Sequence, residues 1–233
     1  MEIMHNKEQK DELLASAHNH AKPMLSEAVF RPMLFSTPMV QALLAGRKTQ
    51  TRRICKLQAD ADCYYIREFS DGILTINYNQ GNENPKLKTP VNVGDIIWVR
   101  ETWNNLNKIE FEPHYIYKAN ESATGKYPIS KWNPSLFMPK SACRIWLKVV
   151  NVRVERLNDI SEDDAINEGI KFEFFNSKKW YYTYENDECS TLSSCISYRS
   201  LWSKINGVGS WDLNPLVWVY DFEVSQDCPH GFR

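Results

Sequence analysis

The sequence predicts an α+β fold, a small mixed β-barrel with short flanking helices and long loop insertions. The segments with strand-like patterns are short, and the three segments with helix-like patterns are short as well. The longest strand, expected over Cys143–Leu157, places its apolar residues at odd positions as far as Val149 and at even positions after it. Such a change of phase requires a β-bulge, and bulges bend a sheet toward barrel closure. Short elements around a bent sheet indicate a small barrel of this class.

The 233 residues suffice for one elaborated domain with a real hydrophobic core. We expect residues 1–30 to form a polar, partly disordered leader. We expect residues 31–228 to form a single domain, because no repeat, low-complexity tract or sharp boundary interrupts them. The irregular stretches inside this domain are interpreted as insertions at 56–90, 104–137 and 171–195.

The domain is expected to begin with an apolar strand at Met33–Phe35 and a short helix over Pro38–Ala45. Ser36 or Thr37 can cap this helix, and a proline suits its first turn because the missing N–H is not needed there. Gly46 is expected to end the helix, since glycine readily adopts the left-handed conformation of a C-terminal cap.

Several strands are predicted in the middle of the chain. The turn dipeptide Asp71-Gly72 indicates a hairpin with strands at 64–66 and 73–76. The apolar segment Ile96–Trp103 predicts another strand, and Ile116 marks a short one.

The last third of the domain carries two helix signals and a final strand. Ser161–Asp164 resembles a capping box with Asp in place of Glu, and it is expected to start a short helix that closes at Glu168. An amphipathic helix over 197–205 and a strand over 216–224 follow.

Composition excludes several classes of protein. The net charge of −1 leaves no global basic field, so any nucleic-acid binding must be local. The six cysteines include no CxxC pair and no histidine at ligand spacing, so we expect reduced thiols, no metal site and no cofactor. No apolar run approaches the ~18 residues of a membrane span and no signal peptide is visible, so we expect a soluble, cytoplasmic protein with no membrane partner.

The segment ALLAGRKTQTRR, residues 42–53, is the strongest candidate for a functional site. Four cations lie within seven residues, and no acid occurs between Arg31 and Lys56. A solvated charge run normally mixes signs. This one directly follows an apolar helix, which fixes its position and predicts a site for an anionic or electron-rich ligand. The candidate residues are Arg47, Lys48, Thr49, Thr51, Arg52 and Arg53.

Lys48, Thr51 and Glu168 are the candidate catalytic residues. Lys48 acting as a base at neutral pH requires its pKa to fall by about 3 units from ~10.4. Burial and the neighbouring arginines favour that fall, and a neutral amine could then activate the Thr51 hydroxyl. Glu168 closes a helix, where the helix dipole disfavours negative charge, and this suits a carboxyl that carries a proton. Either Lys48 and Glu168 share one proton, or Lys48 stays cationic and Glu168 is the base.

The same residues have a second interpretation in which no chemistry occurs. Lys48 and the arginines would bind phosphates, and Thr51 would bond to the backbone. Lys140 and Arg144, at the start of the long strand, would either add phosphate contacts or occupy an exposed strand edge. Aromatic residues in the insertions would stack on bases, at roughly 1–3 kcal/mol per base.

Four blocks of the sequence resemble the ASCH family of the PUA-like superfamily, and the similarity is closest to the longer versions carried by phages and prophages. The blocks are LLAGRKTQTRR, VGDIIWVRETW, ISEDDAINEGI and LWSKINGVGSWDLNPLVWVYDFEV. The similarity covers about half of the chain, over residues 33–55, 91–103, 138–170 and 197–224.

The resemblance implies a PUA-like β-barrel with a cleft lined by the GRKT loop. Small bacterial members of the family are amidohydrolases that remove the acetyl group from N4-acetylcytidine. Their catalytic Lys, Thr and Glu match Lys48, Thr51 and Glu168. Those enzymes are less than half as long and lack the three insertions and the NPLVWVYDFEV ending, so the substrate does not carry over directly.

The sequence thus leads to an amidohydrolase that acts on a modified cytosine nucleoside, with backbone N–H groups of the GRKT loop holding the oxyanion. The alternatives are a non-catalytic RNA- or DNA-binding module that reads a modified base, a ribonuclease, and a protein-interaction role in phage assembly. The sequence does not indicate the oligomeric state.

Overall fold

The computed structural model describes residues 28–56, 64–78, 86–106, 115–120, 129 and 131–232. The predicted leader lies outside the described residues except for its last three positions. The fold is mixed α+β and consists mostly of strands with few helices, as predicted.

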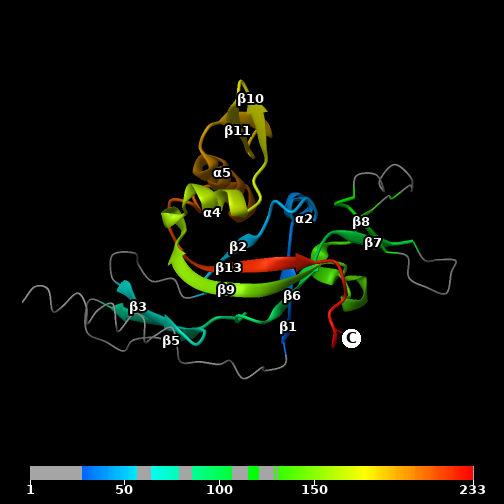
Figure 1. Cartoon of the computed structure of the whole chain (residues 1–233), viewed down its shortest axis with the longest axis horizontal. Helices are drawn as coiled ribbons and strands as arrows, with labels where there is room; N and C mark the ends of the chain where they lie inside the picture. The colour runs from blue at the N-terminus through cyan, green and yellow to red at the C-terminus, as the bar shows by residue number, and fades with distance from the viewer. Residues whose placement is uncertain are drawn as a thin grey trace, which may run out of the picture.

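A five-stranded sheet forms the centre of the molecule (Figure 1). Its strand order is β1-β6-β9-β13-β2; β1 runs parallel to β6, and the other neighbours are antiparallel. The strands are β1 (Phe30–Leu34), β2 (Gln50–Ile54), β6 (Ile96–Arg100), β9 (Trp146–Arg156) and β13 (Leu216–Ser225).

Strands β1 and β2 form the two edges of this sheet, so within the described residues it does not close into the predicted barrel. A side chain spans the gap instead of a backbone ladder. The guanidinium of Arg53 on β2 donates to the carbonyl of Leu34 at 2.8 Å and to the sulfur of Met33 at 3.2 Å, and both acceptors lie on β1. The sheet is therefore bent enough for its edges to approach each other while their main chains stay unpaired.

The predicted bulge in β9 is confirmed. Asn151 pairs with Asp221 and Val149 with Phe222, so Val150 is an extra residue on β9. The extra residue turns the following side chains to the other face of the strand. Odd-numbered Val149 and even-numbered Val152 consequently pack in the same core cluster.

The core has two parts, on opposite faces of β13. Trp218, Tyr220 and Phe222 belong to the larger cluster, which also includes residues of α2. Val217 and Val219 belong to the smaller cluster, under α4 and α5. Because successive side chains of a strand point to opposite faces, this alternation fixes the side of the sheet to which each residue of the paired strand β2 points.

The helices follow their local signals. Helix α2 (Thr37–Leu44) ends before Gly46, whose φ is +67°. Helix α4 (Glu162–Asn167) begins at Ser161, whose hydroxyl accepts a hydrogen bond from the N–H of Asp164. Helix α5 (Ser194–Asn206) starts three residues earlier than predicted, because the hydroxyl of Ser193 caps it. Three short 3-10 helices cover Ser135–Phe137, Lys140–Ala142 and Leu157–Asp159.

The insertions contain three small sheets. The predicted hairpin around Asp71-Gly72 is confirmed and carries a third strand. The segment expected to be an irregular loop at 171–195 forms a three-stranded antiparallel sheet, and two further strands pair in the 104–137 region. The strands are β3 (Tyr64–Ser70), β4 (Ile73–Tyr78), β5 (Lys86–Lys88), β7 (Trp103–Asn105), β8 (Tyr115–Tyr117), β10 (Phe172–Phe175), β11 (Lys178–Thr183) and β12 (Glu188–Thr191).

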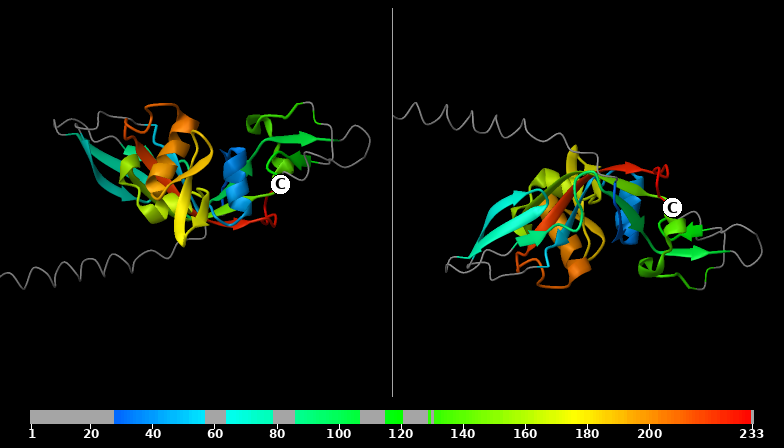
Figure 2. Two further views of the ribbon diagram at one scale, coloured as in Figure 1. Left: turned by 90° about the horizontal axis from the view of Figure 1, so that it is seen from above. Right: turned by 90° about the horizontal axis from the view of Figure 1, so that it is seen from below.

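The insertions extend the molecule along its long axis. The β3–β5 sheet lies at one end and the β7–β8 ribbon at the other, whereas α4, α5 and the β10–β12 sheet stand over one face of the central sheet (Figures 1 and 2). Among the described residues, no helix combines the length and apolar character that crossing a membrane would require.

Candidate functional site

The structure brings Lys48 and Glu168 together. The turn at Gly46 ends α2 and directs the chain into β2, while Glu168 caps the end of α4. The two residues form an isolated backbone bridge, next to a hydrogen bond from the N–H of Thr49 to the carbonyl of Asn167 at 2.9 Å. The Lys48 amine lies 2.6 Å from the Glu168 Oε2 atom and 2.9 Å from the Glu168 carbonyl oxygen. Lys48 is 0% exposed and Glu168 is 2% exposed.

Arg52 holds the other oxygen of the same carboxylate. Its guanidinium lies 3.1 Å from Glu168 Oε1, and it also pairs with Glu155 at 2.5 Å and with Asp164 at 3.2 Å. A wider network surrounds this guanidinium, in which Arg153 pairs with Glu155, Asp164 and Asp221, and Gln50 donates to Asp164 and Asp221. Glu168 is therefore a buried carboxylate that two cations hold in place.

Burial lowers the pKa of Lys48, because a charged amine loses its hydration inside the protein. The neighbouring Glu168 carboxylate acts in the opposite direction, and Arg53 and Arg52 add to the lowering. The net fall is the direction that a base at neutral pH requires.

The lowered pKa of Lys48 predicts how the free energy of unfolding changes with pH. Between the lowered value and the ordinary value of 10.5, the unfolded chain binds more protons than the folded protein, so the free energy of unfolding rises with pH. Below the lowered value both states are protonated at this amine, and the stabilisation is lost. We expect the wild type to gain stability relative to Lys48→Met as the pH rises from neutral toward the ordinary lysine value of 10.5, measured by urea unfolding. A difference between the two proteins that does not change with pH would show that Lys48 remains charged throughout.

Thr51 is fully buried, and its hydroxyl has no hydrogen-bond partner. It pairs with Tyr220 of the larger core cluster, whereas Arg52 pairs with Val219 of the smaller one. The Thr51 side chain therefore points to the opposite face of the sheet from that of Arg52. Among the described residues, no hydrogen bond joins it to Lys48, so the predicted direct activation of the hydroxyl is not the arrangement seen here.

The backbone of the GRKT loop is already occupied. The N–H groups of Arg47 and Lys48 both donate to the carbonyl of Ala42, and that of Thr49 donates to Asn167. These groups are not available as the predicted oxyanion donors. The Arg47 side chain donates to the carbonyl of Gly169 at 2.8 Å, which ties the loop to the end of α4, and the Thr49 side chain is exposed.

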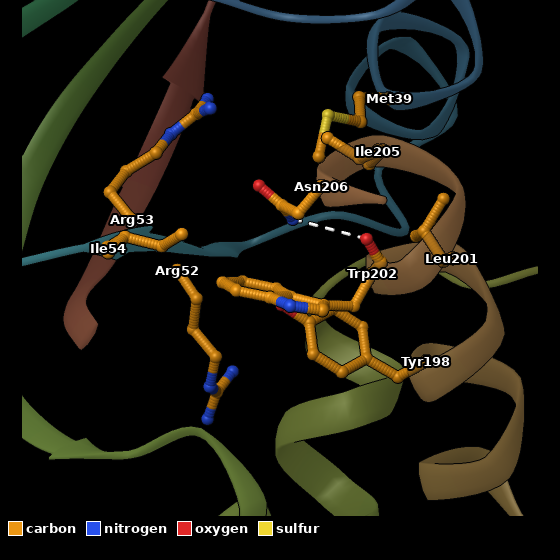
Figure 3. Close-up of a pocket in the computed structure, with 9 residues that line it drawn as sticks. All are labelled: Met39, Arg52, Arg53, Ile54, Tyr198, Leu201, Trp202, Ile205 and Asn206. Carbon is orange, nitrogen blue, oxygen red and sulfur yellow. Dashed lines mark hydrogen bonds between the residues drawn. The ribbon is translucent and has the colours of Figure 1, made fainter. Parts of the chain in front are cut away.

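A pocket of about 60 Å³ is lined by Arg52, which pairs with Glu168, but not by Lys48 or Glu168 themselves (Figure 3). It lies between β2, α2 and α5, and Figure 3 shows the Arg52 and Arg53 side chains extending in opposite directions around it. Its volume holds about four water molecules or a small substituent. The lining residues are Met39, Arg52, Arg53, Ile54, Tyr198, Leu201, Trp202, Ile205 and Asn206.

Two polar groups of this pocket differ from Arg52 in their partners among the described residues. Arg53 has no carboxylate within ion-pair distance, and its guanidinium packs 5.0 Å from the ring of Phe35. The indole N–H of Trp202 is buried and donates to nothing. The Arg53 guanidinium donates to Leu34 and Met33 on β1, so the unpaired donor among these residues is the Trp202 N–H, which suits a ligand atom that accepts a hydrogen bond.

Lys140 and Arg144 lie elsewhere. The Lys140 amine lies 4.5 Å from the centre of the Phe232 ring, and Lys140 lines a separate pocket near the C-terminal end of the chain. Arg144 makes a two-pronged ion pair with the buried Glu101, at 2.8 and 2.9 Å, and stacks on the ring of Tyr117. Both precede Trp146, the first residue of β9, which pairs with Ser225. Ser225 lies five residues along β13 from Tyr220, the partner of Thr51, which is a distance of roughly 17 Å. The structure does not bring these two residues to the Lys48 cluster.

Gly169 shapes the cluster by leaving space for Lys48. Its φ is +88°, and an added Cβ atom would lie 2.7 Å from the Lys48 Cβ and 2.8 Å from the Ala42 Cβ. Gly169→Ala is expected to destabilise the protein by roughly 2–4 kcal/mol in urea unfolding, about 1 from the backbone conformation and the rest from overpacking.

Gly46→Ala is the matched control, because its φ is +67° but no atom lies within 4 Å of the added Cβ. It is expected to cost only about 1 kcal/mol. Equal losses in the two variants would show that the close approach of Lys48 to Gly169 contributes nothing to stability.

Several residues of the site were not predicted from the sequence. Glu155 and Asp164 neutralise Arg52, and Tyr198 and Trp202 line the pocket. Asp221 had a visible signal, since it is the lone acid inside the apolar run LVWVYDF. Tyr198 and Trp202 have the spacing of the apolar face of a helix, and that pattern does not distinguish a pocket wall from core.

No family model matches this chain, and no curated protein or solved structure matches it.

Proposed function

We propose that this protein is an amidohydrolase that removes an acyl group from the exocyclic amine of a modified cytosine nucleoside, of which N4-acetylcytidine is the simplest example. We further propose that it is a long member of the ASCH family, and that its bent, open sheet is a variant of the PUA-like barrel. The observation that carries the proposal is the 2.6 Å contact between the Lys48 amine and the Glu168 carboxylate. It joins residues 120 positions apart in a site where both are almost fully buried.

The cations of the GRKT loop already have partners within the protein, which favours a catalytic role for this loop over phosphate binding. Lys48 and Arg52 are paired with carboxylates, and Arg47 donates to backbone carbonyls. Arg53 likewise donates to the carbonyl of Leu34. Cations that bind phosphate present free donors to solvent, so the engagement of all four cations weakens the phosphate-binding interpretation of this loop.

The proposed roles follow from the remaining free groups. An ammonium has three donors, and Glu168 accepts from two of those on Lys48, which leaves one for a substrate. The Thr51 side chain points to the opposite face of the sheet from Arg52, so we assign the role of the nucleophile to a water molecule. The pocket beside Arg52 would hold the acyl group, with the Trp202 N–H as a donor to its oxygen.

The proposed hydrolysis has one nucleophile and one proton-transfer pair. A water adds to the acyl carbon, the bond from that carbon to the base nitrogen breaks, and the Lys48–Glu168 pair takes a proton from the water and gives one to the leaving amine. Because the pair is buried, the substrate must displace the side chains that cover it.

The test is incubation of the protein with N4-acetylcytidine and a panel of other N4-acylated cytosine nucleosides, followed by chromatography. We expect the free nucleoside and the carboxylic acid as products. The absence of turnover across the panel would overturn the proposal.

A further inference from the structure

The β10–β12 sheet is an insertion whose exposed residues the proposed chemistry does not use. It stands above α4 and α5, away from the central sheet (Figure 1). Strands β10 and β11 are joined at Asn176 and Ser177, both with positive φ, which makes a tight hairpin turn. The two residues before the turn, Phe174 and Phe175, are 72% and 66% exposed.

The two faces of this sheet differ. Phe172 and Tyr181 form a cross-strand pair that packs toward the core under α4 and α5. Residues on the opposite face alternate with these, and include Phe175, Trp180 and Tyr182, of which the last two are half-buried. An antiparallel sheet thus presents a row of aromatic rings on its outer face.

Three lysines accompany the aromatic residues, and none of them has a carboxylate within ion-pair distance among the described residues. The Lys179 amine lies 3.9 Å from the centre of the Phe172 ring, and the Lys171 amine lies 5.8 Å from that of Tyr182. Lys178 is exposed beside Phe175. The nearest acid on the outer face, Glu173, accepts a hydrogen bond from the Tyr182 hydroxyl. The tip of the hairpin is therefore locally cationic in a chain whose net charge is −1.

We propose that the tip of the β10–β11 hairpin binds a single-stranded nucleic acid that passes around it. One base stacks on Phe174 with a phosphate beside Lys179 on one face of the hairpin, and the next base stacks on Phe175 with a phosphate beside Lys178 on the other face. Exposed rings next to unpaired lysines are the combination that recognises a base and its phosphate together. The binding does not depend on the hydrolysis. One further step rests on the proposed function: the bound strand carries the acylated base. The substrate is then a polymer and not a free nucleoside.

The experiment measures the fluorescence anisotropy of a labelled 12-nucleotide oligouridine, and of the matched oligothymidine, titrated with the full chain. We expect the double variant Phe174→Ala, Phe175→Ala to raise the Kd about tenfold or more, since each stacked base is lost. Lys178→Gln with Lys179→Gln should reduce the slope of log K against log salt by about 1.4, from 0.7 for each phosphate contact on a single strand.

Phe137→Ala is the matched control, because Phe137 is also 69% exposed but lies on a 3-10 helix outside this insertion. It should leave the Kd unchanged. Glu173→Gln should tighten binding, because a carboxylate on the outer face repels phosphate. Circular dichroism of each variant checks that the fold is retained.

Other outcomes would overturn the inference. These are an absence of binding to both oligonucleotides, or equal losses in the Phe137 and hairpin variants. Binding of the hairpin only to vesicles of anionic phospholipid, measured by co-sedimentation, would assign the patch to a membrane surface. A dimer in light scattering that the double phenylalanine variant abolishes would assign it to self-association. Failure of the hydrolysis leaves the oligonucleotide result intact, and hairpin variants should not change turnover of a free nucleoside, so the two proposals fail separately.

Discussion

Lys48→Met is expected to lower kcat/KM for N4-acetylcytidine by about 10²–10⁴, the usual contribution of a positioned acid or base. Methionine fills the space of the aliphatic chain but cannot exchange a proton. In the wild type, kcat/KM should rise with pH and reach a plateau below the ordinary lysine value of 10.5, because burial lowers the pKa of this amine and the neutral form is the base. The measurement is initial rates by chromatography over a series of pH values.

Two variants separate this role from others. Lys148→Met is the control, since Lys148 is an exposed residue of β9, and it should leave the rate unchanged. Lys48→Arg keeps the positive charge but cannot act as a base at these pH values. Full activity of a folded Lys48→Arg variant would show that the position needs only a cation.

Glu168→Leu is expected to destabilise the protein by roughly 3–5 kcal/mol, the cost of leaving buried charges without their partner. The substitution removes the acceptor of Lys48 and one of the three carboxylates around Arg52. Urea unfolding at neutral pH measures this loss as a lower midpoint with an unchanged slope.

Glu168→Gln separates the structural role from the chemical one. Glutamine keeps the size and one acceptor oxygen, so it should cost less stability than leucine and still lose most of the turnover, because it cannot carry the proton. Glu185→Leu, at an exposed position, should change stability by no more than about 0.5 kcal/mol. If Glu168→Leu were as mild as that control, the buried ion pairs would contribute little to the fold.

Local signals in the sequence predicted the elements that position the site. Gly46 and Gly169 end their helices in left-handed conformations, and Ser161 caps α4 with its hydroxyl. The change of phase in β9 correctly predicted the bulge beside Val149. Each of these features depends on residues within about four positions of one another, which is the range that a pattern of residue types can report.

Features that depend on distant segments were not predictable in the same way. The bulge indicated a bent sheet. Whether β1 and β2 pair depends on the distance between these two edge strands, which no local pattern encodes. In the structure the Arg53 side chain spans that distance. The 171–195 segment forms strands because its aromatic residues meet across the sheet, as in the pairing of Phe172 with Tyr181.

The candidate site likewise has one part that the sequence predicted and one part that it did not. Residue types and spacing, together with the resemblance to a family, singled out Lys48, Thr51 and Glu168. The direct contact between Lys48 and Glu168 appears in the structure, whereas Thr51 points to the other face of β2. Alternation along a strand determines that face, and it becomes visible only when the bounds of β2 and its pairing with β13 are known.

The position of β2 at the edge of the sheet has a consequence for synthesis on the ribosome. Its neighbour in the sheet is β13 (Leu216–Ser225), so β2 emerges from the ribosome long before the strand with which it pairs. The Glu168 carboxylate follows Lys48 by 120 residues, a delay of about 6–24 s at usual rates of translation. During that interval the sequence QTRRI stays in water, where its two arginines keep it soluble and oppose premature association between nascent chains.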